Sequence, residues 1–261
     1  MVLGSLSVFA VRYAKPKMLI LLSRTRDKWD GSRRLPMEFG LLGKRYEKDY
    51  TEEELEQIYS GITTAVAVPV NVAIKAEHRV LDLARMEEIL MGAKRIVLQD
   101  CGCKVDKGNC NAPRDVCLSL DEAADYEKEF DRYNPKEINL DVALDTLRRS
   151  HEAGLVHMAY TMEGDDSPKI ICSCCSCCCH TLSGLLRFGI AKHVLKSDLT
   201  SETDMGICKG SGVCVERCVF GARKIVDGEL VHDPENCFGC GLCVSTCPEG
   251  AIRLVEKHGS S

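Results

Sequence analysis

The stretch CFGCGLCVSTCPEGAIRLV, residues 237–255, has a near copy, CKGSGVCVERCVFGARKIV, at residues 208–226. A shift of 29 residues superposes all three cysteines of the first copy on cysteines of the second, together with several small and apolar residues. The matches include Cys208 and Cys237, Cys214 and Cys243, Cys218 and Cys247, Gly221 and Gly250, Ala222 and Ala251, and Val226 and Val255. The C-terminal quarter of the chain is therefore an internal repeat of a short cysteine-rich unit.

The second copy has the spacing C-x2-C-x2-C-x3-C-P, which places thiolates around an iron–sulfur cubane. Three thiolates on one tight loop reach three corners of a cluster, and the fourth cysteine points away to the cluster of the other copy. The glycines let backbone N–H groups approach the cluster sulfurs, where hydrogen bonds help to set the reduction potential. On these residues, the segment 200–257 resembles the dicluster bacterial ferredoxins.

The resemblance implies two [4Fe-4S] clusters with interleaved ligands. One cluster takes Cys218, Cys237, Cys240 and Cys243, and the other takes Cys208, Cys214 and Cys247. Ser211 stands where the family has cysteine, and Val219 replaces a proline that Pro248 keeps in the second copy. The serine leaves open a three-iron cluster, a four-iron cluster with Ser211 or water at its fourth corner, or a fourth ligand that the N-terminal domain donates. Paired zinc sites are disfavoured here, because they typically use two C-x2-4-C knuckles with a longer spacer.

Ten further cysteines form two groups upstream of the repeat. One group lies in CGCKVDKGNCNAPRDVC at residues 101–117, and the other lies in ICSCCSCCCH at residues 171–180. Each follows a strand-like segment, and the ends of strands are where layered α/β sheets place their sites. We predict metal ligands at Cys101, Cys103, Cys110, Cys117, Cys172, Cys174, Cys175, Cys177, Cys178 and Cys179.

These thiols suffice for two four-thiolate sites with two thiols left over. Neighbouring residues on extended backbone point to opposite faces, so Cys174 and Cys175 can serve different sites. Cys177, Cys178 and Cys179 reach one metal together only if the chain turns tightly. Beside the repeat, we favour one or two further iron–sulfur clusters over structural zinc and over a thiol or persulfide redox site.

The upstream pattern of a C-x-C segment followed by C-x-CC-x-CCC also resembles cysteine-rich ferredoxin-type proteins of anaerobic prokaryotes. That resemblance implies no established activity. His180, directly after the cysteine run, is expected to cap the helix that follows rather than to bind metal. His151 and His157 are expected to be packing or surface residues.

The periodicity of the chain predicts a mixed α+β fold. Helices are predicted at residues 51–62, where Thr51 and Glu54 form a capping box, and at 80–93 and 139–154. Strands are predicted at residues 64–74, 94–103, 155–162, 169–175, 222–233 and 251–257, with a turn at Asp227-Gly228 and a short helix in 241–247. The charged stretch 120–137 is predicted to be a solvated helix and loop. We expect an α/β-type domain at residues 1–199 and a ferredoxin-like dicluster module at 200–261.

Composition excludes several functions. The net charge of −5 and the 5% aromatic content argue against nucleic-acid binding. The odd count of 17 cysteines and the lack of a convincing signal peptide favour reduced thiols in the cytoplasm. The apolar runs near the N-terminus are too short to span a membrane, which leaves a peripheral membrane contact open.

These features favour an iron–sulfur electron-transfer protein, or an electron-relay subunit of an anaerobic redox complex, that works with redox partner proteins. Neither a G-x-G-x-x-G motif nor a P-loop points to a nucleotide cofactor. The alternatives are a redox enzyme, which would use an open cluster position or the Cys172–Cys179 run, and a redox sensor. The oligomeric state stays open.

Overall fold

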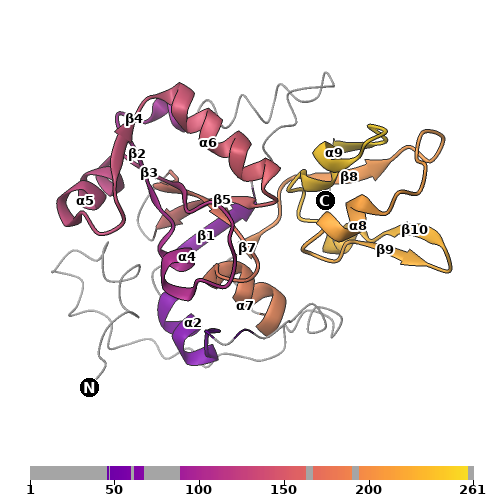
Figure 1. Ribbon diagram of the computed structural model, residues 1–261, viewed down its shortest axis with the longest axis horizontal. Coiled ribbons are helices and arrows are strands. Elements are labelled where there is room, and N and C mark those ends of the chain that lie inside the picture. The colour runs from indigo at the N-terminus through magenta and orange to yellow at the C-terminus, as the bar shows by residue number, and fades with distance from the viewer. Residues whose placement is uncertain are drawn as a thin grey trace.

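The computed structural model describes residues 46, 48–59, 62–67, 89–162, 167–189 and 194–257. Their largest element is a seven-stranded sheet in the order β4-β2-β3-β6-β5-β1-β7 (Figure 1). The strands are β1 (Ile62–Ala67), β2 (Ile96–Asp100), β3 (Asp115–Leu120), β4 (Lys136–Ile138), β5 (Val156–Met162), β6 (Ile170–Cys174) and β7 (Val194–Leu195). Helices and strands are thus mixed in the chain, as an α+β fold predicts.

The pairing of this sheet differs from the parallel arrangement typical of alternating strands and helices. Among the described strands, only β1 and β7 pair in parallel, and every other pair is antiparallel. Antiparallel pairing suits the short connection between β5 and β6, because adjacent antiparallel strands need no crossover helix. The α/β character lies in the helices that cover both faces, not in the strand direction.

The helices described in full that pack on the sheet are α2 (Glu52–Tyr59), α4 (Gly102–Lys107), α5 (Glu122–Phe130), α6 (Leu140–Glu152) and α7 (His180–Phe188). Strand β6 shows how the two faces divide. Ile171 belongs to the core under α6, whereas Ile170 and Cys172 belong to the core that includes residues of α2 and α7. The sheet is therefore the middle of three layers, with α6 on one side and α2, α4 and α7 on the other (Figure 1).

The strand directions gather the upstream cysteines at one edge of the sheet. β2 and β6 are both antiparallel to β3, so they run in the same direction and end at the same edge. Cys101 follows β2, Cys172 and Cys174 lie in the last residues of β6, and Cys117 lies near the start of β3, opposite Gln99. Helices α4 and α7 begin at this edge.

The C-terminal residues form two small sheets and two short helices. β8 (Leu199–Thr203) pairs with β11 (Ile252–Glu256), and β9 (Arg223–Val226) pairs with β10 (Glu229–His232). The helices are α8 (Val213–Arg217), α9 (Leu242–Thr246) and the 3-10 turn η4 (Pro234–Asn236). Gly212 and Gly241, which are 29 residues apart, precede α8 and α9 with φ of 73° and 75°. The sequence repeat is thus a structural repeat.

Polar contacts join this C-terminal unit to α6. The Arg217 guanidinium donates to the carbonyl oxygens of His151 at 3.0 Å and Glu152 at 2.6 Å. The His151 Nε2 atom lies 2.8 Å from the Ser245 hydroxyl of α9. These contacts fix the C-terminal unit against the end of α6 (Figure 1).

Several local predictions are confirmed. Thr51 and Glu54 form the reciprocal capping box, with N–H to side-chain oxygen distances of 2.9 and 3.2 Å. Asp227 and Gly228, with φ of 52° and 86°, make the tight turn between β9 and β10. The predicted strand at 64–74 is described only as far as residue 67, and the predicted helix at 80–93 only from residue 89, where it is helical. The remainder of both lies outside the described residues, as does the N-terminal apolar segment.

Candidate metal centres

Seven cysteines line one cavity at the cysteine edge of the sheet, and we call it the six-thiol cavity because the seventh, Cys175, belongs to a second group described below. The space inside it, counted together with the adjoining open solvent, is about 530 Å³. Its thiols belong to Cys101, Cys103, Cys117, Cys172, Cys174 and Cys179, and its wall also includes Lys104, Tyr160, Ile170, Cys175 and His180. Cysteines 70 residues apart in the sequence therefore meet here, because β2, β3 and β6 are neighbours.

The histidine of this cavity departs from the sequence prediction. The residue before helix α7 is Cys179, not His180, and no side-chain hydrogen bond caps the helix. The His180 ring is buried instead, with Nδ1 3.3 Å from the Cys103 sulfur. Burial lowers the pKa of His180 to about 4, so its imidazole is neutral at pH 7. The expected capping role is wrong, because α7 starts one residue earlier in the cysteine run and its first side chain points into the cavity.

A buried lysine is the counter-charge of the six-thiol cavity. Lys104 of α4 is 1% exposed, and its ammonium donates to the Ser173 carbonyl oxygen at 3.0 Å. Burial alone would lower the pKa of Lys104, but the negative charge of nearby cysteine sulfurs, that of Cys101 foremost, raises it above its ordinary value. No carboxyl group is among the strongest influences on this amine. A buried ammonium is costly unless paired, so the cavity is built for negatively charged sulfur.

The thiols of the cavity also act on one another. The Cys117 and Cys172 sulfurs lie 3.9 Å apart. Hydrogen bonds from Cys103 and Cys117 lower the pKa of Cys101 well below its usual value, despite its burial. Without metal, one thiolate is thus stabilised by hydrogen bonds from neighbouring thiols. A bound metal would displace the protons of those thiols, since metals bind the deprotonated sulfur.

Four other thiols form a tighter group, which we call the thiol quartet: Cys110, Cys175, Cys177 and Cys178. Their sulfur atoms all lie within 4.8 Å of one another. Cys110 follows α4, whereas the other three lie in the turn between β6 and α7. Among the described residues, no other set of three or more Cys, His, Asp or Glu side chains meets this criterion.

The upstream cysteines thus divide six to four, and the division falls inside the cysteine run. Cys174 faces the six-thiol cavity, whereas Cys175 belongs to the quartet and touches the cavity wall. Cys177 and Cys178 share the quartet because residues 176–178 form a turn, and Cys179 returns to the cavity. The structure brings all ten residues into two adjoining sites.

A third group of thiols surrounds a cavity of about 340 Å³ in the C-terminal unit. Cys218, Cys237, Cys240 and Cys243 line it together with Phe220, Phe238 and Gly239. Gly239 has a φ of 67°, and a Cβ there would lie 2.3 Å from the Leu199 carbonyl oxygen, so only glycine fits. Four thiols around a glycine-lined hollow match the donor set of a four-iron cubane.

One thiol of this third group is poised to be a thiolate. Burial opposes ionisation of Cys237, but hydrogen bonding from the His232 side chain and from the backbone N–H groups of Gly239 and Ser201 outweighs it. The pKa of Cys237 falls to about 6 as a result. Such N–H···S bonds are one of the means by which a protein tunes a cluster.

The remaining ferredoxin-type cysteines differ in their burial. Cys214 is buried with Cys243 and Ile252 in a small core, against which Cys247 packs. Cys208 is half-buried, and Ser211 is exposed in a loop between two glycines of positive φ. The Ala251 N–H donates to the Cys247 sulfur at 3.4 Å.

Sequence reasoning missed Lys104 and the residues that support the turn before α7. The sequence around Lys104 does not indicate that this side chain is buried, because partners from the distant strands β3 and β6 surround it.

His151 and His157 were predicted to be packing or surface residues. Both are buried packing residues, with parallel rings whose centroids lie 5.8 Å apart.

Residues 230–253 match the family model of the 4Fe-4S binding domain. A comparison with curated proteins finds no match to the chain. The match covers three of the four thiols around the third cavity, so the chain carries a ferredoxin-type region that binds at least one [4Fe-4S] cluster. None of the helices in the described part of the chain has the length and apolar character needed to cross a membrane.

Proposed function

We propose that this chain relays electrons between its ferredoxin-type region and a metal–sulfur centre in the six-thiol cavity. A [4Fe-4S] cluster supplies one-electron transfer when it is bound. The observation that carries the proposal is that both cavities border the same buried core. Cys101, Cys117, Cys172, Cys174 and Cys179 belong to one core cluster with Phe220, Phe238 and Leu242, and Cys218 and Cys240 pack against it.

Two aromatic rings lie in this shared core beside the ferredoxin-type site. Phe220 and Phe238 stack with their ring centroids 4.3 Å apart, and both are buried and line the third cavity. Both rings belong to the core cluster that also contains five cysteines of the six-thiol cavity. A closely packed core keeps the two metal centres at a fixed separation. It also leaves little solvent to reorganise around either centre during electron transfer.

The proposal assigns the ligands as follows. Cys218, Cys237, Cys240 and Cys243 hold one four-iron cluster, and Cys208, Cys214 and Cys247 hold a second, with Ser211 at its fourth corner. We assign the division into an N-terminal unit at residues 1–199 and a dicluster module at 200–261. The linker that ends at Asp198 and the start of β8 at Leu199 support this boundary. Lys104 balances the negative charge in the six-thiol cavity.

We further place the protein in the cytoplasm of an anaerobic cell, where it exchanges electrons with redox partner proteins. The odd count of 17 cysteines supports this setting. The test is an anaerobic redox titration followed by electron paramagnetic resonance, with iron and acid-labile sulfide counted per chain. A relay predicts reducible clusters in the C-terminal unit and a separate paramagnetic signal that the double substitution Cys172→Ser, Cys174→Ser removes. Iron confined to the C-terminal clusters would refute the relay and leave the ferredoxin-type region intact.

A second candidate function is a redox enzyme that acts in the six-thiol cavity. The observation in its favour is the number of donor groups around this cavity. Six thiols and the neutral ring of His180 exceed the four donors that a cubane needs. Shifts of the cavity's paramagnetic signal on adding small thiols or cyanide would favour the enzyme, and an unchanged signal would favour the relay.

A further inference from the structure

The thiol quartet has the spacing of ligands around one ion. In a tetrahedral site with Zn–S bonds of about 2.3 Å, neighbouring sulfurs are about 3.8 Å apart. Three sulfur pairs of the quartet match this edge: Cys110 and Cys175 at 3.8 Å, Cys110 and Cys178 at 3.9 Å, and Cys177 and Cys178 at 3.7 Å. The whole set lies within 4.8 Å.

A cubane requires a wider set. Each thiolate binds its own iron, so two Fe–S bonds and the separation of the irons stand between any two ligand sulfurs. The ferredoxin-type site gives the comparison within this structure. Cys218, Cys237, Cys240 and Cys243 surround a hollow, and no three of these described residues have sulfurs that all lie within 4.8 Å. The chain thus contains both spacings, and the quartet has the one that suits a single ion.

We propose that Cys110, Cys175, Cys177 and Cys178 bind one Zn²⁺ ion in a closed, four-thiolate structural site. Soft thiolate donors in tetrahedral array select zinc or iron. Zinc binds such a site more tightly than ferrous iron does, in line with the general order of divalent-metal affinities. Four protein ligands leave no open position, which is typical of structural rather than catalytic zinc.

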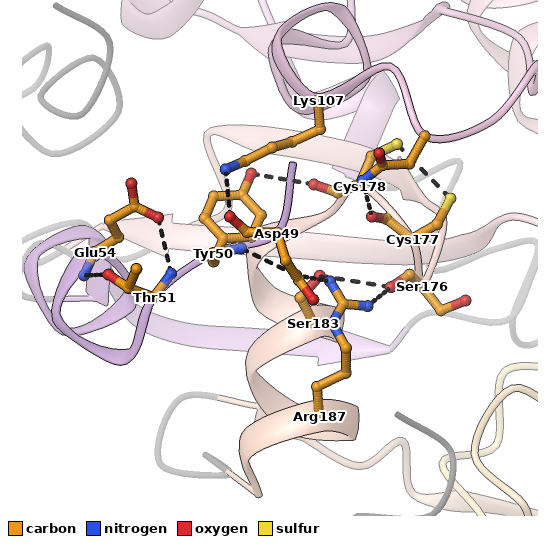
Figure 2. A network of polar contacts seen from close by, with 11 residues as sticks. Asp49, Tyr50, Thr51, Glu54, Lys107, Ser176, Cys177, Cys178, Ser183 and Arg187 are labelled. Atoms are coloured by element: carbon orange, nitrogen blue, oxygen red, sulfur yellow. Dashed lines mark hydrogen bonds and ion pairs between the residues drawn. The ribbon is translucent and has the colours of Figure 1, made fainter. Parts of the chain in front are cut away.

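The backbone of the turn is held in place from outside the quartet. Figure 2 shows that side chains from other segments form hydrogen bonds with the carbonyl groups of this turn. The Tyr50 hydroxyl donates to the Cys178 carbonyl at 3.1 Å, the Asn109 amide donates to the Cys177 carbonyl at 3.0 Å, and Arg187 donates to the Ser176 carbonyl. With its carbonyls held in this way, the turn presents its sulfurs to Cys110. Such second-layer contacts orient ligands in metal sites.

One of these contacts is itself anchored by a buried ion pair. Arg187 and Asp49 are 2.6 Å apart, with side chains 3% and 10% exposed. The Lys107 ammonium of α4 donates to the Asp49 carbonyl at 3.2 Å (Figure 2). Helices α4 and α7 are therefore tied together around the quartet. The ion would lock the segment after α4 to the turn before α7, where Cys175 and Cys179 also line the six-thiol cavity. The inference holds whether or not that cavity contains a cluster.

The test uses the full chain, produced with both iron and zinc supplied and purified without oxygen. Zinc-edge X-ray absorption should show four sulfur neighbours at about 2.3 Å and no nearby iron. Cys110→Ser and Cys178→Ser should each remove most of the zinc and leave the iron and sulfide counts unchanged. The matched control, Cys208→Ser, alters a thiol in the ferredoxin-type region and should lower iron without lowering zinc.

Two results would overturn the assignment. One is a loss of iron and sulfide, rather than zinc, from the quartet variants, which would make the quartet part of a cluster. The other is a wild-type protein that lacks zinc, or whose zinc has nitrogen or oxygen neighbours. The X-ray absorption measurement is made on the wild-type protein. It therefore tests the proposal even if the variants fail to fold. A missing signal from the six-thiol cavity would count against the electron relay alone.

Discussion

Replacing Lys104 by methionine tests whether the six-thiol cavity holds negative charge. The two side chains have similar length, and the substitution removes the ammonium together with its hydrogen bond to the Ser173 carbonyl. Lys104 is 1% exposed, so solvent cannot replace the lost charge. Removing one partner from a buried charge pair costs about 3–5 kcal/mol, because the other partner is left uncompensated.

The sign of the effect distinguishes the two states of the cavity. If the cavity sulfurs are thiolates bound to metal, Lys104→Met should lower the free energy of unfolding of the metal-loaded protein by about 3–5 kcal/mol. If the sulfurs are neutral thiols, the lysine is an unpaired buried charge, and methionine should be neutral or stabilising. A free-energy change of 3 kcal/mol corresponds to a rate factor of about 100 if it appears wholly in unfolding.

The assay is unfolding in guanidinium under anaerobic conditions, followed by cluster absorbance and by far-ultraviolet circular dichroism. Lys128→Met is the control, since Lys128 pairs with Glu137 on the surface, and such pairs contribute at most about 1 kcal/mol. The metal-loaded Lys104 variant should unfold about 100-fold faster or more, and the reduction potential of the cavity centre should become more negative. A variant with unchanged iron that unfolds no faster than the wild type would refute the charge argument.

Three further predictions concern the C-terminal unit. Arg217→Ala removes the bonds to the His151 and Glu152 carbonyls, so the unit should come loose from α6 at a cost of about 1–3 kcal/mol, seen as faster limited proteolysis between the two units. Burial and the charge of Arg217 lower the pKa of His151 to about 4, so its contribution to stability is complete above pH 6.5 and is lost as the pH falls towards 4. Between pH 7.5 and 5.5 the wild type should lose about 1.3 kcal/mol that His151→Gln does not lose, and equal pH slopes in denaturant titrations would contradict this. Ser211→Cys should change the paramagnetic signal and oxygen sensitivity of the Cys208 cluster if its fourth corner lacks a thiolate; an unchanged spectrum and iron count would show that Ser211 faces no open corner.

Local signals in the sequence predicted most of the regular elements. The capping box at Thr51, the Asp227-Gly228 turn and the apolar periodicity of α6 each depend on residues a few positions apart, and each is present in the structure. Strand β3 was harder to predict, although it is central in the sheet and carries Cys117. Its run of six residues, DVCLSL, is too short to show a clear period. The three-residue strand β4 is concealed in the same way within a charged stretch.

The candidate sites differ in the same way: some depend on residues close together in the sequence, and others depend on contacts between distant segments. The C-terminal thiols were predictable because one loop supplies most of them at fixed spacing. The partition of the ten upstream cysteines depends on which strands are neighbours, and β2, β3 and β6 come from distant parts of the chain. Lys104 is hidden from the sequence for the same reason, since its burial requires both β3 and β6. Tertiary pairing, not composition, decides which thiol meets which.

The spacing within Cys172–Cys179 then acquires a physical meaning. Cys172 and Cys174 are two residues apart on strand β6, so they share the face that lines the six-thiol cavity. The strand ends after Cys174, and the turn at residues 176–178 directs the next thiols to the quartet. Cys179 precedes the first turn of α7 and returns to the cavity. A strand, a turn and a helix start thus distribute six nearly adjacent cysteines between two sites. Inserting one residue after Ser173 would shift the strand register, turn Cys174 to the other face and take a thiol from the cavity, although the number of cysteines would be unchanged.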